Sequence, residues 1–148
     1  PMQRVDLKEL CETTLQTHLD AATAKRMDLG LDAQPAMVMG HDWLLRELLG
    51  NLVDNAVKYT PEGGTVTIRC GEREGVAFVE VEDDGPGIPR AERSRVLERF
   101  YRVQGTMGEG NGLGLAIADE IARAHQSHLE LHGSNEKGGL KVTLRFTG

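Results

Sequence analysis

The sequence predicts an α/β (α+β) fold, a two-layer sandwich in which a mixed sheet of about five strands carries three main helices on one face. The order of the segments supports this: a helix and two strands, a helix and two strands, a long segment without a regular pattern, then a helix and two strands. The length of 148 residues suits one domain, 1–148, with a single core. We interpret this domain as a fragment of a longer protein.

Periodic apolar residues define each element of the sandwich. Spacings of three and four residues predict helices over 6–27, between Asp42 and Pro61, and over 113–124. Asp42 is a good N-cap, and a helix should end before Pro61. The expected strands are 29–32, 36–39, 65–71, 76–83, 129–132 and 140–146. The first two should be a pair joined by the turn at Gln34-Pro35.

Composition excludes several classes of function. With 17 basic and 23 acidic residues, the net charge of −6 argues against nucleic-acid binding as the main role. The sequence holds no transmembrane run and no signal-peptide pattern. Cys11 and Cys70 fit buried thiols better than a disulfide or a metal site. His128 and His132 fall in a strand-like segment, so they are interpreted as structural and no zinc site is expected.

The helix that ends before Pro61 has two unlike faces. Its apolar residues fill one arc, while Asn51, Asn55 and Lys58 share the opposite arc. Amide oxygens spaced four residues apart suit Mg²⁺, and a lysine one turn later suits a phosphate. Taken alone, the same pattern also fits an ordinary solvated helix face.

The predicted strand 76–83 ends on a carboxylate that faces inward. Its odd-numbered residues are apolar until Asp83, so the alternation turns Asp83 toward the interior. A buried carboxylate requires a hydrogen-bond partner, which could be a cap, a salt bridge or a ligand. Gly85 and Gly87 follow, and both allow a close approach to the backbone.

A glycine-rich segment precedes the last helix. Gly110, Gly112 and Gly114 lie where free N–H groups and the positive end of a helix dipole would face an anion. This pattern is neither a Walker loop nor a Rossmann fingerprint. The sequence pattern fits both a phosphate-binding loop and a flexible loop before a helix. A long loop of this kind often acts as a mobile lid.

Four motifs occur in order along nearly the whole chain: Asn51-x-x-x-Asn55 with Lys58-Tyr59, Asp83-x-Gly85-x-Gly87, Phe100-Tyr101-Arg102, and Gly110-x-Gly112-Leu113-Gly114-Leu115. Together they resemble the catalytic and ATP-binding domain (HATPase, Bergerat fold) of bacterial two-component sensor histidine kinases. The wider group includes gyrase, Hsp90 and MutL.

The resemblance implies ATP and Mg²⁺ as cofactors and assigns a role to each residue. Asn55 coordinates Mg²⁺ with help from Asn51, Lys58 contacts phosphate, and Asp83 accepts the adenine amine. Arg102, and with it Arg99, reaches the γ-phosphate from the lid. The further ATP contacts it implies are Tyr59, Gly85, Gly87, Ile88, Gly110, Gly112, Leu113 and Gly114. The catalytic set is Asn51, Asn55, Lys58 and Arg102.

Asn51 separates subgroups of this superfamily. Gyrase-like ATPases have an acid at that place, and an amide cannot act as a general base. The resemblance therefore implies a protein histidine kinase that hydrolyses ATP poorly and transfers the γ-phosphoryl group to a histidine. The histidine box is absent from this chain, so the acceptor belongs to an upstream dimerisation domain. Glu47 is left as a helix-face residue without an assigned role.

Partners and location follow from the same resemblance. We expect a cognate response regulator, no nucleic acid, and a parent protein that is a membrane-anchored homodimer in the bacterial inner membrane. This domain would be cytoplasmic and monomeric. Two alternatives are a free-standing anti-sigma-factor serine kinase and a gyrase- or MutL-like ATPase module. Phe100-Tyr101-Arg102 and the first helix favour the sensor kinase over the anti-sigma kinase.

Overall fold

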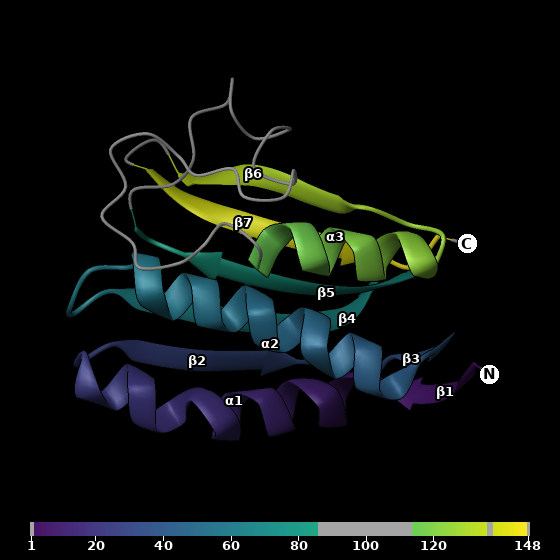
Figure 1. Ribbon diagram of the computed structural model, residues 1–148, viewed down its shortest axis with the longest axis horizontal. Helices are drawn as coiled ribbons and strands as arrows, with labels where there is room; N and C mark the ends of the chain where they lie inside the picture. Colours follow the sequence, from purple (N-terminus) through teal and green to yellow (C-terminus); the bar gives the residue numbers. More distant parts are fainter. Residues whose placement is uncertain (1, 86–113, 136–137, 148) are drawn as a thin grey trace.

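The computed structural model describes residues 2–85, 114–135 and 138–147. Within them it confirms the predicted two-layer sandwich, with three helices on one face of a mixed five-stranded sheet. Figure 1 shows α2 crossing the middle of the sheet between α1 and α3. No helix in these residues is long and apolar enough to cross a membrane.

The predicted elements are present, with small shifts at their ends. The helices are α1 (Leu7–Ala24), α2 (Asp42–Tyr59) and α3 (Gly114–Ala124). The strands are β1 (Gln3–Asp6), β2 (Asp28–Ala33), β3 (Met37–Gly40), β4 (Thr65–Arg73), β5 (Val76–Asp83), β6 (Leu129–Asn135) and β7 (Gly138–Arg145). The β4–β5 turn is tighter than expected, because Glu74 and Gly75 both adopt positive φ, as a two-residue hairpin requires.

The pairing of β2 and β3 with each other was predicted wrongly. The large sheet has the order β2-β4-β5-β7-β6, and β2 runs parallel to β4. β3 instead pairs antiparallel with β1, a strand that was not predicted, in a separate two-stranded sheet. Leu7 N–H donates to Ala36 O at 2.9 Å, so the start of α1 holds the chain between β2 and β3 away from a hairpin path.

The core lies between the helices and the sheet. The apolar side of α2 is buried along its length, and it faces valines, leucines and an isoleucine of β4, β5 and β7. Cys11 and Cys70 are both buried as free thiols, which confirms their structural interpretation. His125 is also structural: its Nδ1 faces Ile121 O at 2.8 Å, and its Nε2 accepts from His41 N–H at 3.0 Å. The His41 contact joins α3 to the start of α2.

Asp42 is not the N-cap of α2. The cap is His41, which makes no side-chain capping bond, and Asp42 is the first helical residue. Its carboxylate instead accepts from Arg46 Nε at 2.8 Å, one turn along the helix. A carboxylate in the first turn still interacts favourably with the helix dipole.

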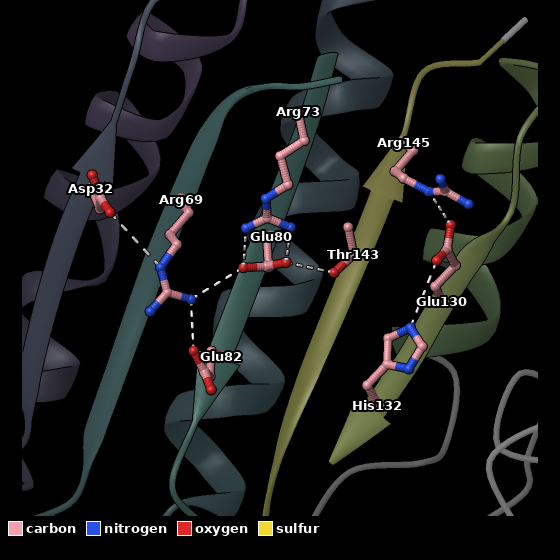
Figure 2. A network of polar contacts seen from close by, with 9 residues as sticks. All are labelled: Asp32, Arg69, Arg73, Glu80, Glu82, Glu130, His132, Thr143 and Arg145. Atoms are coloured by element: carbon pink, nitrogen blue, oxygen red, sulfur yellow. Dashed lines mark hydrogen bonds and ion pairs between the residues drawn. The ribbon is translucent and has the colours of Figure 1, made fainter. Parts of the chain in front are cut away.

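The face of the sheet without helices carries a charged network (Figure 2). At its centre is Glu80 of β5, whose side chain is 1% exposed. It accepts hydrogen bonds from Arg73 at 3.0 Å, from Arg69 at 3.1 Å and from the Thr143 hydroxyl at 2.8 Å. Burial alone would raise the pKa of Glu80, but the bonds from Arg73 and Thr143 hold that pKa below its ordinary value.

Glu80→Gln should lower the free energy of unfolding by about 2 kcal/mol, because a buried acceptor loses the charge that strengthens its hydrogen bonds from Arg69, Arg73 and Thr143. Urea denaturation at pH 7 measures this. Since the folded-state pKa of Glu80 is lowered from 4.5, its contribution is present above that pH and is lost as the pH falls through the folded value. Glu82→Gln is the matched control, since Glu82 bonds the same Arg69 but is 23% exposed. Equal losses for the two variants would contradict this role for Glu80.

Candidate functional site

The polar side of α2 forms one wall of the candidate site. Asn51 and Asn55 are half-buried, while Lys58 is exposed and forms an ion pair with Asp54 at 3.0 Å. The opposite side of the helix is buried, so the two-faced pattern predicted from the sequence is confirmed. The Nδ2 atom of Asn51 is buried and has no hydrogen-bond partner among the described residues. An unpaired buried donor is costly unless a ligand or water satisfies it.

Lys25 fixes the C-terminal end of this wall. Its Nζ donates to Val57 O at 2.7 Å, to Lys58 O at 3.2 Å and to Thr60 O at 2.6 Å. Carbonyls at the end of a helix lack intrahelical partners, and a cation there also interacts favourably with the helix dipole. Lys25 therefore positions the backbone from Val57 to Thr60, a role that was not predicted from the sequence.

The end of β5 packs directly against this end of α2. A Cβ added to Gly85 would lie 3.2 Å from both Asp83 Oδ1 and Tyr59 O, and 3.3 Å from Thr60 Cα, so only glycine fits without displacement. Gly139 N–H donates to Gly85 O at 2.7 Å, which ties the start of β7 to the same point. Three elements that are distant in sequence thus meet at Gly85.

Two neighbouring aspartates at this point have different surroundings. Asp84 is exposed, and its Oδ1 accepts from Thr65 N–H at 2.8 Å, which fastens the end of β5 to the start of β4. Asp83 is partly buried, and its Oδ1 accepts from Gly85 N–H at 2.9 Å. Asp83 is thus the carboxylate held inside the fold, as the alternation of β5 predicted.

Burial raises the pKa of Asp83 from 3.8 to about 6, even though backbone N–H groups of Gly85 and Leu140 favour its ionised form. No cation is paired with Asp83 among the described residues. A carboxylate in this environment is poorly compensated, and its strong acceptor capacity is available to a donor from a ligand.

Thr60 is a site residue that sequence analysis missed. It is 1% exposed, and its hydroxyl has no hydrogen-bond partner among the residues that the structure describes. It lies beside Gly85, and an added Cβ at Gly64 would also collide with its methyl group. Its position has no local sequence signal, because the contacts that bury it form only when Gly64 and Gly85 pack beside it.

The structure places part of the predicted site. It describes Asn51, Asn55, Lys58, Tyr59, Asp83 and Gly85, and it begins α3 at Gly114. It brings the end of α2 and the end of β5 into contact, which unites Tyr59 with Asp83 and Gly85. The predicted residues that lie outside the described ranges are Gly87, Ile88, Arg99, Arg102, Gly110, Gly112 and Leu113.

Comparison with known proteins gives consistent matches. Residues 40–147 match the family described as histidine kinase-, DNA gyrase B-, and HSP90-like ATPase. Over 141 residues the chain is 40% identical to the sensor protein kinase PmrB of Pseudomonas aeruginosa, covering 95% of this chain and 30% of PmrB. The chain thus spans less than a third of the length of that relative.

Solved structures agree with the sequence matches. The mycobacterial sensor histidine kinase MprB superposes with a TM-score of 0.87 at 29% identity, covering 98% of this chain and 96% of that one. Full-length ShkA, solved in complex with AMPPNP, superposes with a TM-score of 0.83 at 27% identity, covering 97% of this chain and 30% of ShkA. The sandwich and the connections described above are therefore shared with histidine kinases.

Lys25→Met should lower the free energy of unfolding by about 2 kcal/mol, because three carbonyls at the end of α2 lose a charged donor. Thermal or urea denaturation measures the loss. Lys8→Met is the matched control, since Lys8 is exposed on α1 and should change stability by less than about 0.5 kcal/mol. The capping role fails if the two variants are equally stable.

Asp83 should make the protein less stable as the pH rises from about 4 to about 6. Its folded-state pKa is raised, so the folded state keeps a proton that the unfolded state releases within this window. Asp83→Asn should remove this decline and gain about 2 kcal/mol at pH 7. Urea denaturation from pH 4 to pH 7 measures both effects. The exposed Asp28→Asn serves as a control that should keep the wild-type decline, and an unchanged profile for Asp83→Asn would contradict the assignment.

Proposed function

Because the chain belongs to the histidine kinase-, DNA gyrase B- and HSP90-like ATPase family, we propose that it binds Mg-ATP and donates the γ-phosphoryl group to a histidine on a separate dimerisation domain. The family and the matches to PmrB and MprB make it the ATPase-type catalytic domain of a sensor histidine kinase. The observation that carries the finer proposal is the partly buried carboxylate of Asp83 beside Gly85, which is paired with no cation among the described residues.

Asp83 and its neighbours suit the base of the nucleotide. The carboxylate accepts the exocyclic amine of adenine, and a donor in that position compensates its burial. The absence of a side chain at Gly85 keeps the carboxylate against the end of α2, where Tyr59 lies against the ring. The unpaired hydroxyl of Thr60 is a further polar group that a nucleotide or a bridging water would satisfy.

The polar side of α2 suits the phosphates and the metal. Among the described residues no group of three or more His, Cys, Asp or Glu side chains could hold a metal ion. A magnesium ion here would use amide oxygens and nucleotide phosphates, which fits its usual binding through few protein ligands. Asn55 would be the main ligand with help from Asn51, and Lys58 would contact phosphate. When bound, the ion neutralises charge on the transferring group.

The remaining ATP contacts come from the sequence motifs. Arg102 and Arg99 would stabilise charge on the γ-phosphate, and Gly87 with Ile88 would border the base. Gly110, Gly112, Leu113 and Gly114 are proposed to cover the phosphates from the side opposite α2. Phosphoryl transfer requires alignment and charge neutralisation, which these cations and N–H groups provide.

A kinase is favoured over an ATPase by Asn51. The amide cannot take a proton from water, so a bound nucleotide keeps its γ-phosphate until an acceptor arrives. The acceptor histidine and a cognate response regulator are proposed to lie outside this chain, in a membrane-anchored parent and its partner. PmrB, of which the chain covers 30%, is named a sensor protein kinase.

The direct test mixes the domain with γ-labelled ATP and a separate histidine-containing dimerisation domain. Transfer should phosphorylate the partner, and the phosphoryl group should be stable in base and labile in acid. Without that partner, phosphate release should be slow. Acid-stable phosphoserine on an anti-anti-sigma protein would support the serine-kinase alternative instead, and rapid phosphate release without any acceptor would support the ATPase alternative.

Asp83→Asn should weaken ATP binding by at least about tenfold, because a charged acceptor contributes about 1.5–3 kcal/mol. Calorimetric titration with ATP and with ADP measures it, and the loss should be similar for both because the contact is to the base. The control Asp28→Asn should bind like the wild type. If Asp83→Asn keeps the wild-type affinity, the assignment of Asp83 to adenine is wrong.

A further inference from the structure

The free edge of β2 has unpaired backbone groups. Within the described residues β2 pairs only with β4 and ends the large sheet. Asp28 N–H donates to Gly64 O and Gln34 N–H donates to Cys70 O, both at 2.9 Å. Because strand residues alternate, the even-numbered positions of β2 bond to β4. The N–H and C=O groups of the odd-numbered positions therefore face away from the sheet; these positions are Leu29, Leu31 and Ala33.

A groove lies beside this edge on the helix side. It has a volume of about 410 Å³ and is lined by residues of α1 and by one residue of β2: Glu12, Thr13, Leu15, Gln16 and Leu31. Leu19, one turn after Leu15, is 40% exposed. Figure 1 shows α1 lying along the outer side of β2, beyond the last strand of the sheet. A strand added to β2 would therefore have α1 above it and apolar side chains to pack against.

The opposite side of the edge is acidic. Asp28 and Asp32 are exposed, and within the described part of the chain the ion pair of Asp32 is a long one, 3.9 Å from Arg69. Arg69 is held more closely by Glu82, at 2.6 Å, so it does little to neutralise Asp32. Glu12 adds a further negative charge in the groove. A basic segment is therefore the complementary occupant.

The same charges disfavour a second copy of this chain. Antiparallel self-pairing centred on Gly30 would place Asp28 of one copy opposite Asp32 of the other, and parallel pairing in register would align identical aspartates. Like charges directly opposite each other in a sheet are destabilising. Natural proteins use edge charges in this way to prevent association of identical edges.

We propose that the free edge of β2 binds an extended basic segment of a partner protein as an additional strand. Alternate side chains of that segment enter the groove against Leu15 and Leu31, while the intervening Lys or Arg side chains face Asp28 and Asp32. Main-chain hydrogen bonds to β2 provide affinity and the two rows of side chains provide specificity. The free edge uses other residues than the proposed nucleotide site at the ends of α2 and β5.

Amide exchange followed by NMR tests this on the full 148-residue chain. The probe is a capped seven-residue peptide of alternating Lys and Val. In the free protein the amides of Gly30 and Asp32 should exchange slowly, while those of Leu29, Leu31 and Ala33 should exchange quickly. Adding the peptide should slow the last three by at least about tenfold. Two further peptides carry the same charges but are N-methylated, one at the odd-numbered and the other at the even-numbered residues. Only one of these two sets of N–H groups faces β2 in the bound strand. The peptide methylated on that set should fail to protect the amides.

Charge variants complete the test. Asp28→Lys should weaken peptide binding about fivefold, the effect of a surface charge pair. The matched control Glu74→Lys carries the same charge change on the exposed β4–β5 turn and should bind normally. The proposal is overturned if the peptide leaves the three amides unprotected, or if both methylated peptides protect them equally. Concentration-dependent protection without peptide would also overturn it, since the occupant would then be a second copy. None of these outcomes depends on ATP binding.

Discussion

The close packing of β5 against α2 at Gly85 is the contact on which the candidate site depends. A Cβ there would lie 3.2 Å from both Asp83 Oδ1 and the Tyr59 carbonyl oxygen, so a side chain would push the strand end and the helix end apart, and glycine lets them pack closely. β7 joins the same point through the bond from Gly139 to Gly85. This contact brings a carboxylate and a helix with a polar side into one place, although neither is unusual alone.

The carboxylate at this contact lowers the stability of the folded protein when it is ionised. Burial raises the pKa of Asp83, so the ionised form that a base-binding role requires is also the form that destabilises the folded protein. Support comes from two polar devices nearby. Lys25 bonds three carbonyls at the end of α2, and Asp84 fastens the end of β5 to Thr65 N–H. Rigid support of this kind compensates a site that is locally unfavourable.

Sequence patterns predicted the helices and strands well, because the spacing of apolar residues within a segment determines which element it forms. Helical spacing placed α2, and alternation placed β5 and turned Asp83 inward. Besides the unpredicted strand β1 and the N-cap of α2, the main failure was pairing: β2 and β3 are close in sequence, but β2 joins β4 and β3 joins β1. Alternation says which face a strand buries and nothing about its neighbour.

The site was predictable to the same extent. Face and alternation placed Asn51, Asn55 and Asp83 correctly in the fold, while their roles as site residues came from the motif resemblance and stay predictions. Thr60 and Lys25 were not predicted, because their roles exist only once α1 and β5 pack against the end of α2. Such long-range contacts have no local sequence pattern, and a buried hydroxyl without a partner is visible only in three dimensions.

A comparison of two carboxylates on β5 shows how structure separates support from function. Glu80 and Asp83 are three residues apart and therefore lie on opposite faces of the sheet. Glu80 is the more buried, yet two arginines and a hydroxyl hold its pKa below the ordinary value. Among the described residues Asp83 receives hydrogen bonds from backbone N–H groups alone, and burial raises its pKa. Burial is common to both, so the difference lies in compensation: side chains of the protein satisfy the Glu80 carboxylate, while Asp83 can still accept from a donor that none of the described residues provides.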